Sequence, residues 1–148
     1  MRPVNQALLK RRAGTDVESF QENYKRHGHL VLPWCMANCV SYYAQVHNPR
    51  WFSSEVAQKH PDVNLQEYDA AAEMVFEGEP GFAGRYYENV VLADERRILF
   101  SEAREHLRLV DPGSVVGDRI EFIVDGRPTV AFGEWKRHWE DCEKAAAG

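Results

Sequence analysis

Three histidines stand close together in the first third of the chain, and they are the residues best suited to do chemistry. His27 and His29 follow a stretch with helical spacing, and His47 ends a stretch of alternating residues. Imidazole changes its charge nearer to physiological pH than any other unperturbed side chain. With carboxylates further along the chain at Asp69 and Glu73, this cluster predicts proton-transfer chemistry.

The sequence gives weaker signals for other kinds of chemistry. Cys35 and Cys39 could hold a metal together with a nearby histidine, but a second ligand pair at a defined spacing is missing. Buried free thiols are the simpler interpretation. The chain contains no phosphate-binding glycine loop, no dinucleotide fingerprint and no nucleophile elbow. We therefore expect acid–base catalysis without a metal or an organic cofactor.

Bulk properties narrow the class of protein. A length of 148 residues indicates one domain with a hydrophobic core. The formal net charge of −5 argues against non-specific binding to nucleic acid, which requires a basic surface. No apolar run approaches the roughly 20 residues of a membrane-spanning helix. Because the N-terminus also lacks an apolar signal core, the expected location is cytoplasmic.

Hydrophobic spacing predicts the elements that position the first histidines. Residues 4–12 are typical of a short strand. Thr15 and Glu18 match a capping box, which predicts a helix over residues 16–32. Pro33 helps to end that helix, because the residue before a proline disfavours helical backbone angles.

The middle of the chain predicts two further strands. Strict alternation indicates a strand over residues 36–47, which Asn48-Pro49 breaks. Residues 50–66 have no clean period and indicate a loop with a short helical turn, long enough to form a lid or an oligomer contact. Alternation returns over residues 68–77, which predicts the next strand.

The last part of the chain completes an α+β pattern. Residues 85–107 predict one or two helices, and a turn at residues 111–113 precedes a strand over residues 114–124. An Asp125-Gly126 turn and a C-terminal helix over residues 132–146 follow. The order predicts a ferredoxin-like βαββαβ core over residues 4–125, with a four-stranded antiparallel sheet, two helices on one face and a C-terminal helical extension over residues 130–146.

Alternation also assigns side chains to the two faces of this sheet. We expect two apolar sets to face the helices: Val40, Tyr42, Ala44 and Val46 in one strand, and Ala70, Ala72, Met74 and Phe76 in the next. The other face then carries Tyr43, Gln45, His47, Asp69 and Glu73. Buried polar groups need partners, so this set predicts a polar pocket, although a solvent-facing sheet would also explain it. Residues 94–97 and 102–105 are expected on exposed helix faces.

Several segments together carry a resemblance to a known family. They are Leu8-Leu-Lys-Arg-Arg-Ala-Gly14 with Phe20 and Tyr24, His27-Gly-His29, Tyr43-Ala-Gln45-Val-His47, Tyr68-Asp69-Ala-Ala-Ala-Glu73, and Tyr86-Tyr-Glu-Asn-Val-Val with Asp94-Glu95. In their order and spacing the chain resembles the EthD-domain family of the dimeric α+β barrel superfamily, and especially its fungal polyketide-tailoring members. His29 stands where members of that family usually carry proline.

The resemblance implies a homodimer with one pocket per subunit and a small aromatic or polyketide acid as substrate, without a metal or an organic cofactor. It also implies a lyase-type reaction, with decarboxylation first and dehydration or cyclisation as alternatives. In decarboxylation, His27 or His47 would protonate the ring carbon as carbon dioxide leaves. The other imidazole, with Tyr43 and Gln45, would hold a neighbouring oxygen, and Asp69 and Glu73 would orient the histidines or act as the base. The remaining expected substrate contacts are His29, Tyr24, Trp51 and Phe52.

Two interpretations from other classes stay open at this stage. A non-catalytic accessory protein would bind a reactive polyketide and carry it between enzymes. Haem or oxygen chemistry is the other alternative, because related barrels include haem-binding enzymes and cofactor-free monooxygenases.

Overall fold

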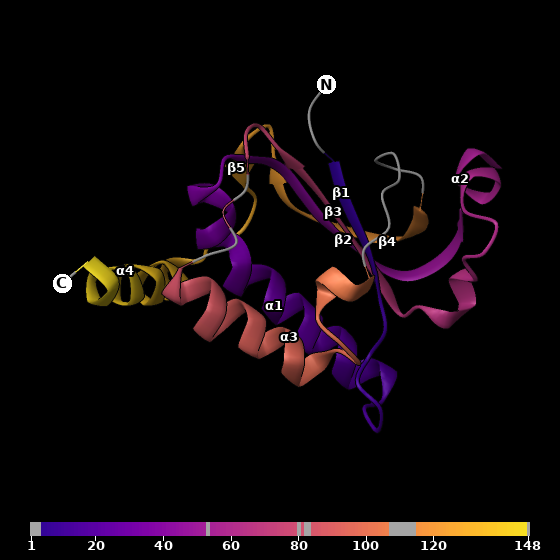
Figure 1. The fold of residues 1–148 in the computed structure, drawn as a ribbon, viewed down its shortest axis with the longest axis horizontal. Coiled ribbons are helices and arrows are strands. Elements are labelled where there is room, and N and C mark those ends of the chain that lie inside the picture. The colour runs from indigo at the N-terminus through magenta and orange to yellow at the C-terminus, as the bar shows by residue number, and fades with distance from the viewer. Residues whose placement is uncertain (1–3, 53, 80, 82–83, 107–114, 148) are drawn as a thin grey trace.

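An antiparallel sheet and a layer of helices make up the fold (Figure 1). The computed structural model describes residues 4–52, 54–79, 81, 84–106 and 115–147. Over these residues the predicted α+β class is confirmed, and the sheet has five strands where the sequence predicts four. In chain order the strands and helices are β1 (Val4–Leu9), α1 (Val17–Ala37), β2 (Val40–Phe52), α2 (Ser54–Lys59), β3 (Ala70–Phe76), α3 (Leu92–Ile98), β4 (Val115–Val124), β5 (Arg127–Pro128) and α4 (Gly133–Ala147), with short helical turns at Leu65–Glu67, Tyr87–Val91 and Ala103–His106.

The strand order is β1-β3-β2-β4-β5, and every neighbouring pair is antiparallel. β3 lies between β1 and β2, the two strands that α1 connects, as in a split β-α-β unit. β4 pairs with the other side of β2, whereas the predicted ferredoxin-like order would place it beside β1, and β5 is a further strand of only two residues. Asp125 and Gly126 join β4 to β5 with φ angles of 51° and 76°, as tight hairpin turns of this kind require. The predicted turn at these two residues is confirmed.

Helix α1 differs from its prediction at both ends. Its N-cap is Asp16, whose side chain accepts a hydrogen bond from the Ser19 amide at 2.8 Å, so the predicted capping box at Thr15 is wrong by one residue. The helix also continues beyond Pro33 to Ala37. A proline inside a helix costs about 3 kcal/mol, but the following Trp34 is buried in the core. Burial of the last helical turn offsets that cost, and the predicted end at residue 32 is wrong.

Strand β2 is displaced along the chain from its prediction. It begins at Val40, after Cys39 with a φ of 55°, and runs to Phe52. The predicted break at Asn48-Pro49 is wrong, because β2 continues through both residues. They lie at an irregularity in the pairing with β4, between His47 and Trp51. Asn48 there has a φ of 50°.

Helices α1 and α3 lie side by side on one face of the sheet, whereas α2 lies apart from them (Figure 1). The predicted C-terminal helix is confirmed as α4, which packs beside α1. Trp139 of α4 meets the ring of Tyr86 edge-on, with 5.4 Å between ring centroids. The Arg26 guanidinium of α1 lies 5.0 Å from the ring centroid of Trp135. Through Trp135 and Trp139, α4 packs against the largest buried cluster, which includes Trp34, Tyr43 and Tyr86.

The register of the central strands corrects the predicted faces. Gln45 of β2 pairs with Ala72 of β3, and Ala44 pairs with Glu73. Neighbours in register share a face, so Gln45 faces the helices together with Ala72, whereas Glu73 faces the other way. The expected helix-facing set of β3 is therefore correct. The expected helix-facing set of β2 is correct only at Val40. The pairing with β3 shifts by one residue between Val40 and Tyr42, so the side chains of Tyr42, Ala44 and Val46 lie on the other face.

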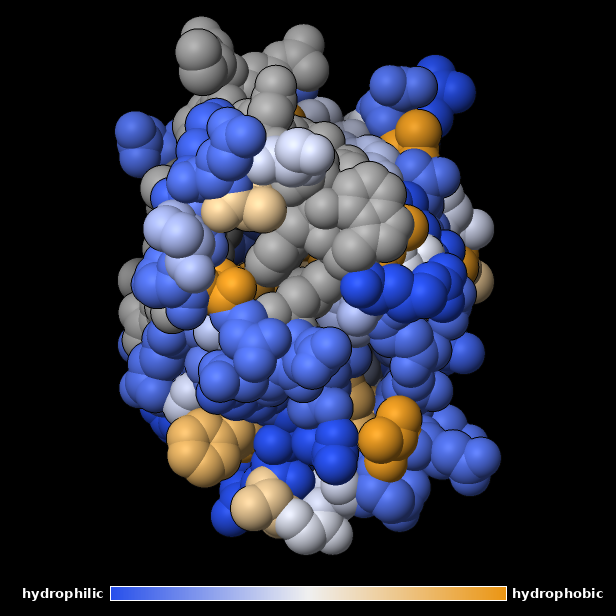
Figure 2. Space-filling model, turned by 90° about the vertical axis from the view of Figure 1, so that its right-hand side faces the viewer, coloured by the Kyte–Doolittle hydropathy of each residue, from blue (hydrophilic) through white to orange (hydrophobic). Residues whose placement is uncertain are grey.

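The second face of the sheet carries a smaller apolar cluster. Leu8, Val46, Ala71 and Val115 are buried there, and Val63 and Tyr68 from the segment before β3 pack against them. That segment holds α2 and a short helical turn, so the predicted loop is largely confirmed, although its first residues belong to β2. On the side of α2 the coloured surface is mainly hydrophilic, with hydrophobic residues scattered among hydrophilic ones (Figure 2).

Candidate active site

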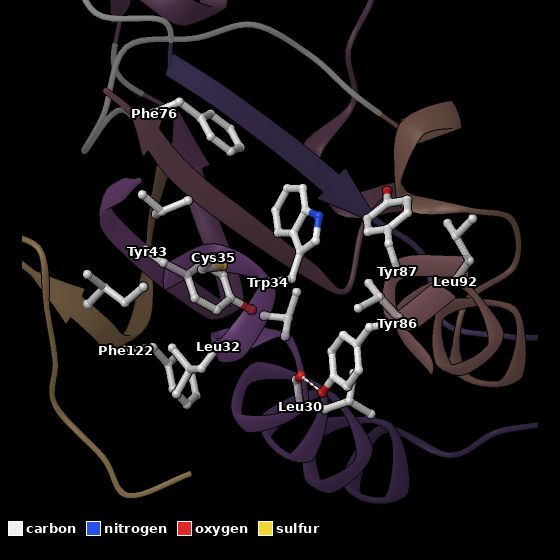
Figure 3. Packing of buried hydrophobic residues seen from close by; sticks show 14 residues of the cluster. Leu30, Leu32, Trp34, Cys35, Tyr43, Phe76, Tyr86, Tyr87, Leu92 and Phe122 are labelled. Carbon is white, nitrogen blue, oxygen red and sulfur yellow. Dashed lines mark hydrogen bonds between the residues drawn. The ribbon is translucent and has the colours of Figure 1, made fainter. Parts of the chain in front are cut away.

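A cavity of about 120 Å³ lies between the helix-facing side of the sheet and helices α1 and α3. Its wall is mostly apolar and aromatic, and Figure 3 shows four of its rings, those of Trp34, Tyr43, Phe76 and Tyr87. The described lining residues are Ala7, Leu9, Tyr24, His27, Val31, Trp34, Tyr43, Ala72, Met74, Phe76, Tyr87, Val91, Glu95, Ile98, Leu99 and Ala103. A cavity of this composition suits a small aromatic molecule.

One imidazole in this wall is held by a buried carboxylate. Nδ1 of His27 lies 2.7 Å from Oδ2 of Asp94, and both residues are only 6% exposed. Burial acts to raise the pKa of Asp94, but hydrogen bonds from His27 and Arg97 outweigh it and hold the pKa below its ordinary value. The ionised carboxylate accepts a hydrogen bond from Nδ1–H of His27. Nε2 of His27 is therefore the ring nitrogen that can gain or lose a proton.

A second carboxylate lies on the other side of the same ring. Oε1 of Glu95 is 3.8 Å from Nε2 of His27, and Glu95 is itself part of the cavity wall. Asp94 and Glu95 are neighbours on α3 and point about 100° apart around the helix. They can therefore contact opposite edges of one imidazole. The amide of Ala103 donates to Oε2 of Glu95 at 3.4 Å, which fixes this carboxylate from the other end.

The expectation that residues 94–97 form an exposed helix face is wrong for the first two of them. Asp94 and Glu95 are among the buried charged residues of the protein. One sequence signal could have found Glu95. It lies four residues after Val91 and three before Ile98, on the apolar stripe of the helix, where a charged residue needs a reason.

His47 faces the helices but lies behind the wall of the cavity. Its Nε2 is 2.8 Å from Oε1 of Gln45, and burial lowers its pKa to about 4, so the ring is neutral at pH 7. Tyr24 separates the two predicted catalytic histidines. Its ring centroid is 6.4 Å from that of His27 and 5.3 Å from that of His47.

Gln45 connects His47 to the cavity wall. Its Nε2 donates to the backbone carbonyl of Tyr24 at 2.6 Å and to the hydroxyl oxygen of Tyr43 at 3.3 Å. Helix α1 can lie this close to Gln45 because Gly28 has no side chain. A Cβ atom at Gly28 would stand 2.8 Å from Nε2 of Gln45 and 2.5 Å from Cζ of Phe122.

The remaining predicted site residues lie elsewhere. His29 is half-buried, with Nδ1 at 3.0 Å from the Lys25 carbonyl and its ring edge-on to Phe122, outside the described cavity lining. The expectation that Asp69 and Glu73 share a pocket with His47 is wrong.

Asp69 accepts from the Arg11 amide at 2.9 Å and pairs with the Arg11 guanidinium. Glu73 is bound by Gln6 and Arg119 on the far face of the sheet. Trp51 and Phe52 belong to β2, but their side chains lie outside the described part of the structure.

Among the described residues, no three His, Cys, Asp or Glu side chains come together as metal ligands would. Cys35 is buried, as predicted for a free thiol, whereas Cys39 is exposed and Cys142 half-buried. None of the described helices is both long and apolar enough to cross a membrane.

Comparison with protein-family models, with curated proteins and with solved structures finds no match to this chain.

Proposed function

We propose that this chain is an acid–base enzyme of the EthD type, in which His27 transfers a proton to or from a small aromatic or polyketide molecule bound in the cavity. The observation that carries the proposal is the buried hydrogen bond between Asp94 and His27 in the wall of an apolar cavity. Ionisable groups are expensive to bury, and a cleft that gathers them is a candidate site for catalysis. The resemblance to EthD-domain proteins supports the same reaction class and adds the proposal of a homodimer.

Decarboxylation is the reaction that we propose first. The bond between a ring carbon and its carboxylate breaks, the electron pair stays on the ring carbon, and this carbon takes the proton from Nε2 of His27 as carbon dioxide leaves. Asp94 keeps the imidazole in the required orientation. A substrate carboxylate is unfavourable beside Glu95 in an apolar cavity, whereas neutral carbon dioxide is not. This difference favours loss of carbon dioxide.

Dehydration or cyclisation is the second candidate, and one feature of the cavity favours it. Among the described residues of the wall there is no lysine or arginine. An enolisable or phenolic substrate without a charge would therefore fit without leaving a carboxylate unpaired. In that case neutral His27 removes the proton that begins the reaction.

Replacement of His27 tests the proposed function. The chain is incubated with a panel of aryl polyketide acids and their uncharged analogues, and mass spectrometry detects loss of carbon dioxide or of water. His27→Gln should lower the rate roughly 10²–10⁴-fold, because it removes the proton-transfer group.

His29→Gln is the matched control, since it removes an imidazole that lies outside the described cavity wall, and it should stay within a few-fold of wild type. Equal rates for His27→Gln and wild type would overturn the assignment. Tight binding of panel members without turnover of any of them would overturn the enzymatic proposal and point to a carrier.

A further inference from the structure

The hydrogen-bond partners of Gln45 determine which way its amide points. Nε2 faces the Tyr24 carbonyl at 2.6 Å, and a carbonyl can only accept. The amide nitrogen must therefore lie on that side, next to the hydroxyl oxygen of Tyr43 as well. Oε1 then faces Nε2 of His47 at 2.8 Å, and this ring nitrogen must carry the proton. The three side chains form one directional chain of hydrogen bonds from His47 through Gln45 to Tyr43.

The direction of this chain leaves the proton of Tyr43 available to a ligand. Its hydroxyl oxygen accepts from Gln45, so its own proton points elsewhere, and the described residues offer it no acceptor within hydrogen-bond distance. Tyr43 lines the cavity, and its hydroxyl points into the cluster of buried side chains drawn in Figure 3, which includes Trp34. The hydroxyl of Tyr24, by contrast, donates to the Ala71 carbonyl at 3.3 Å.

Both Tyr43 and His47 keep fixed protonation states near pH 7. Burial raises the pKa of Tyr43 well above its ordinary value, and Cys35 and Glu95 act in the same direction, so the phenol keeps its proton. His47 is neutral, with its proton on Nε2. Its Nδ1 is buried and has no hydrogen-bond partner among the described residues. A neutral ring behind the cavity wall is suited to holding Gln45 in place.

We propose that Tyr43 donates a hydrogen bond to an oxygen of the bound substrate, and that His47 is a positioning residue that acts on Tyr43 through Gln45. This inference rests on the proposed function and specifies how the same cavity recognises a phenol or enolate oxygen. His27 moves the proton, and Tyr43 stabilises the negative charge that develops on the oxygen. The two predicted catalytic histidines thus have different roles.

Binding of a matched pair of probes tests the inference without requiring turnover. Para-chlorophenol carries the hydroxyl, and para-chlorotoluene replaces it with a methyl group of similar size. Calorimetric titration gives the dissociation constant of each. Tyr43→Phe should weaken para-chlorophenol binding about tenfold, as loss of one buried hydrogen bond predicts. Para-chlorotoluene should bind wild type and variant alike, which also shows that the cavity remains intact.

Variants of His47 separate positioning from proton transfer. His47→Leu should weaken para-chlorophenol binding by at least about threefold, since Gln45 is no longer held. His47→Gln keeps an N–H donor near the position of Nε2 and should stay within about twofold of wild type. In the Tyr43→Phe background, His47→Leu should cause no further loss, because coupled residues are not additive.

Three outcomes would overturn the inference. They are equal affinity of wild type and Tyr43→Phe for para-chlorophenol, additive losses in the double variant, and failure of wild type to bind para-chlorophenol more tightly than para-chlorotoluene. The proposed function fails separately, when the substrate panel is not turned over or when His27→Gln is as active as wild type.

Discussion

At the scale of single residues, Gly28 explains why the segment from His27 to His29 has a glycine in the middle of a long helix. Glycine lowers helix stability by roughly 1 kcal/mol relative to alanine. At this position, however, a Cβ atom would stand 2.5 Å from the ring of Phe122. The close approach of α1 to the sheet therefore requires glycine. It also places His27 beside α3 and Gln45 beneath α1.

Gly28→Ala should destabilise the protein by about 1–3 kcal/mol, because overpacking outweighs the gain in helix propensity. Urea unfolding followed by circular dichroism measures the change. Gly133→Ala is the matched control, since nothing lies within 4 Å of the position of its Cβ atom. That variant should be neutral or slightly more stable. An equal gain in stability from both substitutions would contradict the packing argument.

At the scale of elements, an ion pair connects β3 and β4 across β2, on the face away from the helices. The Arg119 guanidinium donates to both carboxylate oxygens of Glu73, at 2.8 and 3.1 Å. Gln6 of β1 donates to the same carboxylate at 2.7 Å. Glu73 is fully buried, so its charge depends on these partners. The network connects β1, β3 and β4 through one carboxylate on the face of the sheet opposite the cavity.

Arg119→Met should destabilise the protein by roughly 2–4 kcal/mol, because it leaves the buried Glu73 without its cation. The control is Arg50→Met, which removes the exposed pair between Arg50 and Asp118. That pair also connects β2 to β4, but exposed pairs contribute only about 0–1 kcal/mol. Urea unfolding of both variants tests the difference. Similar losses from the two substitutions would show that burial of Glu73 does not decide the energy.

At the scale of the whole molecule, buried His47 makes folding depend on pH. Its pKa is about 4 in the folded chain, against an ordinary value of 6.5. Between these values the unfolded chain binds a proton that the folded chain excludes. The stability that depends on neutral His47 is therefore fully present above about pH 6.5, and it is lost as the pH is lowered toward 4. The pKa of Asp94 is lowered from its ordinary value of 3.8. Protonation of Asp94 therefore destabilises the folded chain only at still lower pH.

The free energy of unfolding should decrease by roughly 3 kcal/mol through His47 alone between about pH 7 and pH 4. Urea titrations at several pH values measure this slope. His47→Gln cannot titrate, and the difference between the two curves isolates the contribution of His47. Parallel curves for wild type and His47→Gln would contradict the prediction.

The sequence predicted the order of the main elements, because the alternation and the apolar spacing of the larger helices and strands are strong. It missed the end of α1, where the buried Trp34 continues the helix past Pro33. The assignment of His47, Gln45 and Glu73 to one face also failed. Relative faces of two strands depend on register, and a shift of one residue near Tyr42 reverses them.

His27 and Tyr43 were identified from the sequence as site residues, and both lie in the cavity wall. Asp94 and Glu95 were not. The place of Glu95 on the apolar stripe of the helix was a usable signal, whereas no local pattern marks Asp94 as buried. Their role depends on α3 packing beside α1, a contact between segments nearly 70 residues apart in the chain.

Trp34 gives the cavity an optical property of its own. Its indole ring is part of the wall, with the N–H donating to the Gly81 carbonyl at 2.9 Å and the ring centroid 5.2 Å from that of Tyr87. Indole emission responds to the polarity and to the quenching groups of its surroundings. A molecule that enters the cavity therefore changes the fluorescence of the protein without any added label, and occupancy of the site can be followed in real time.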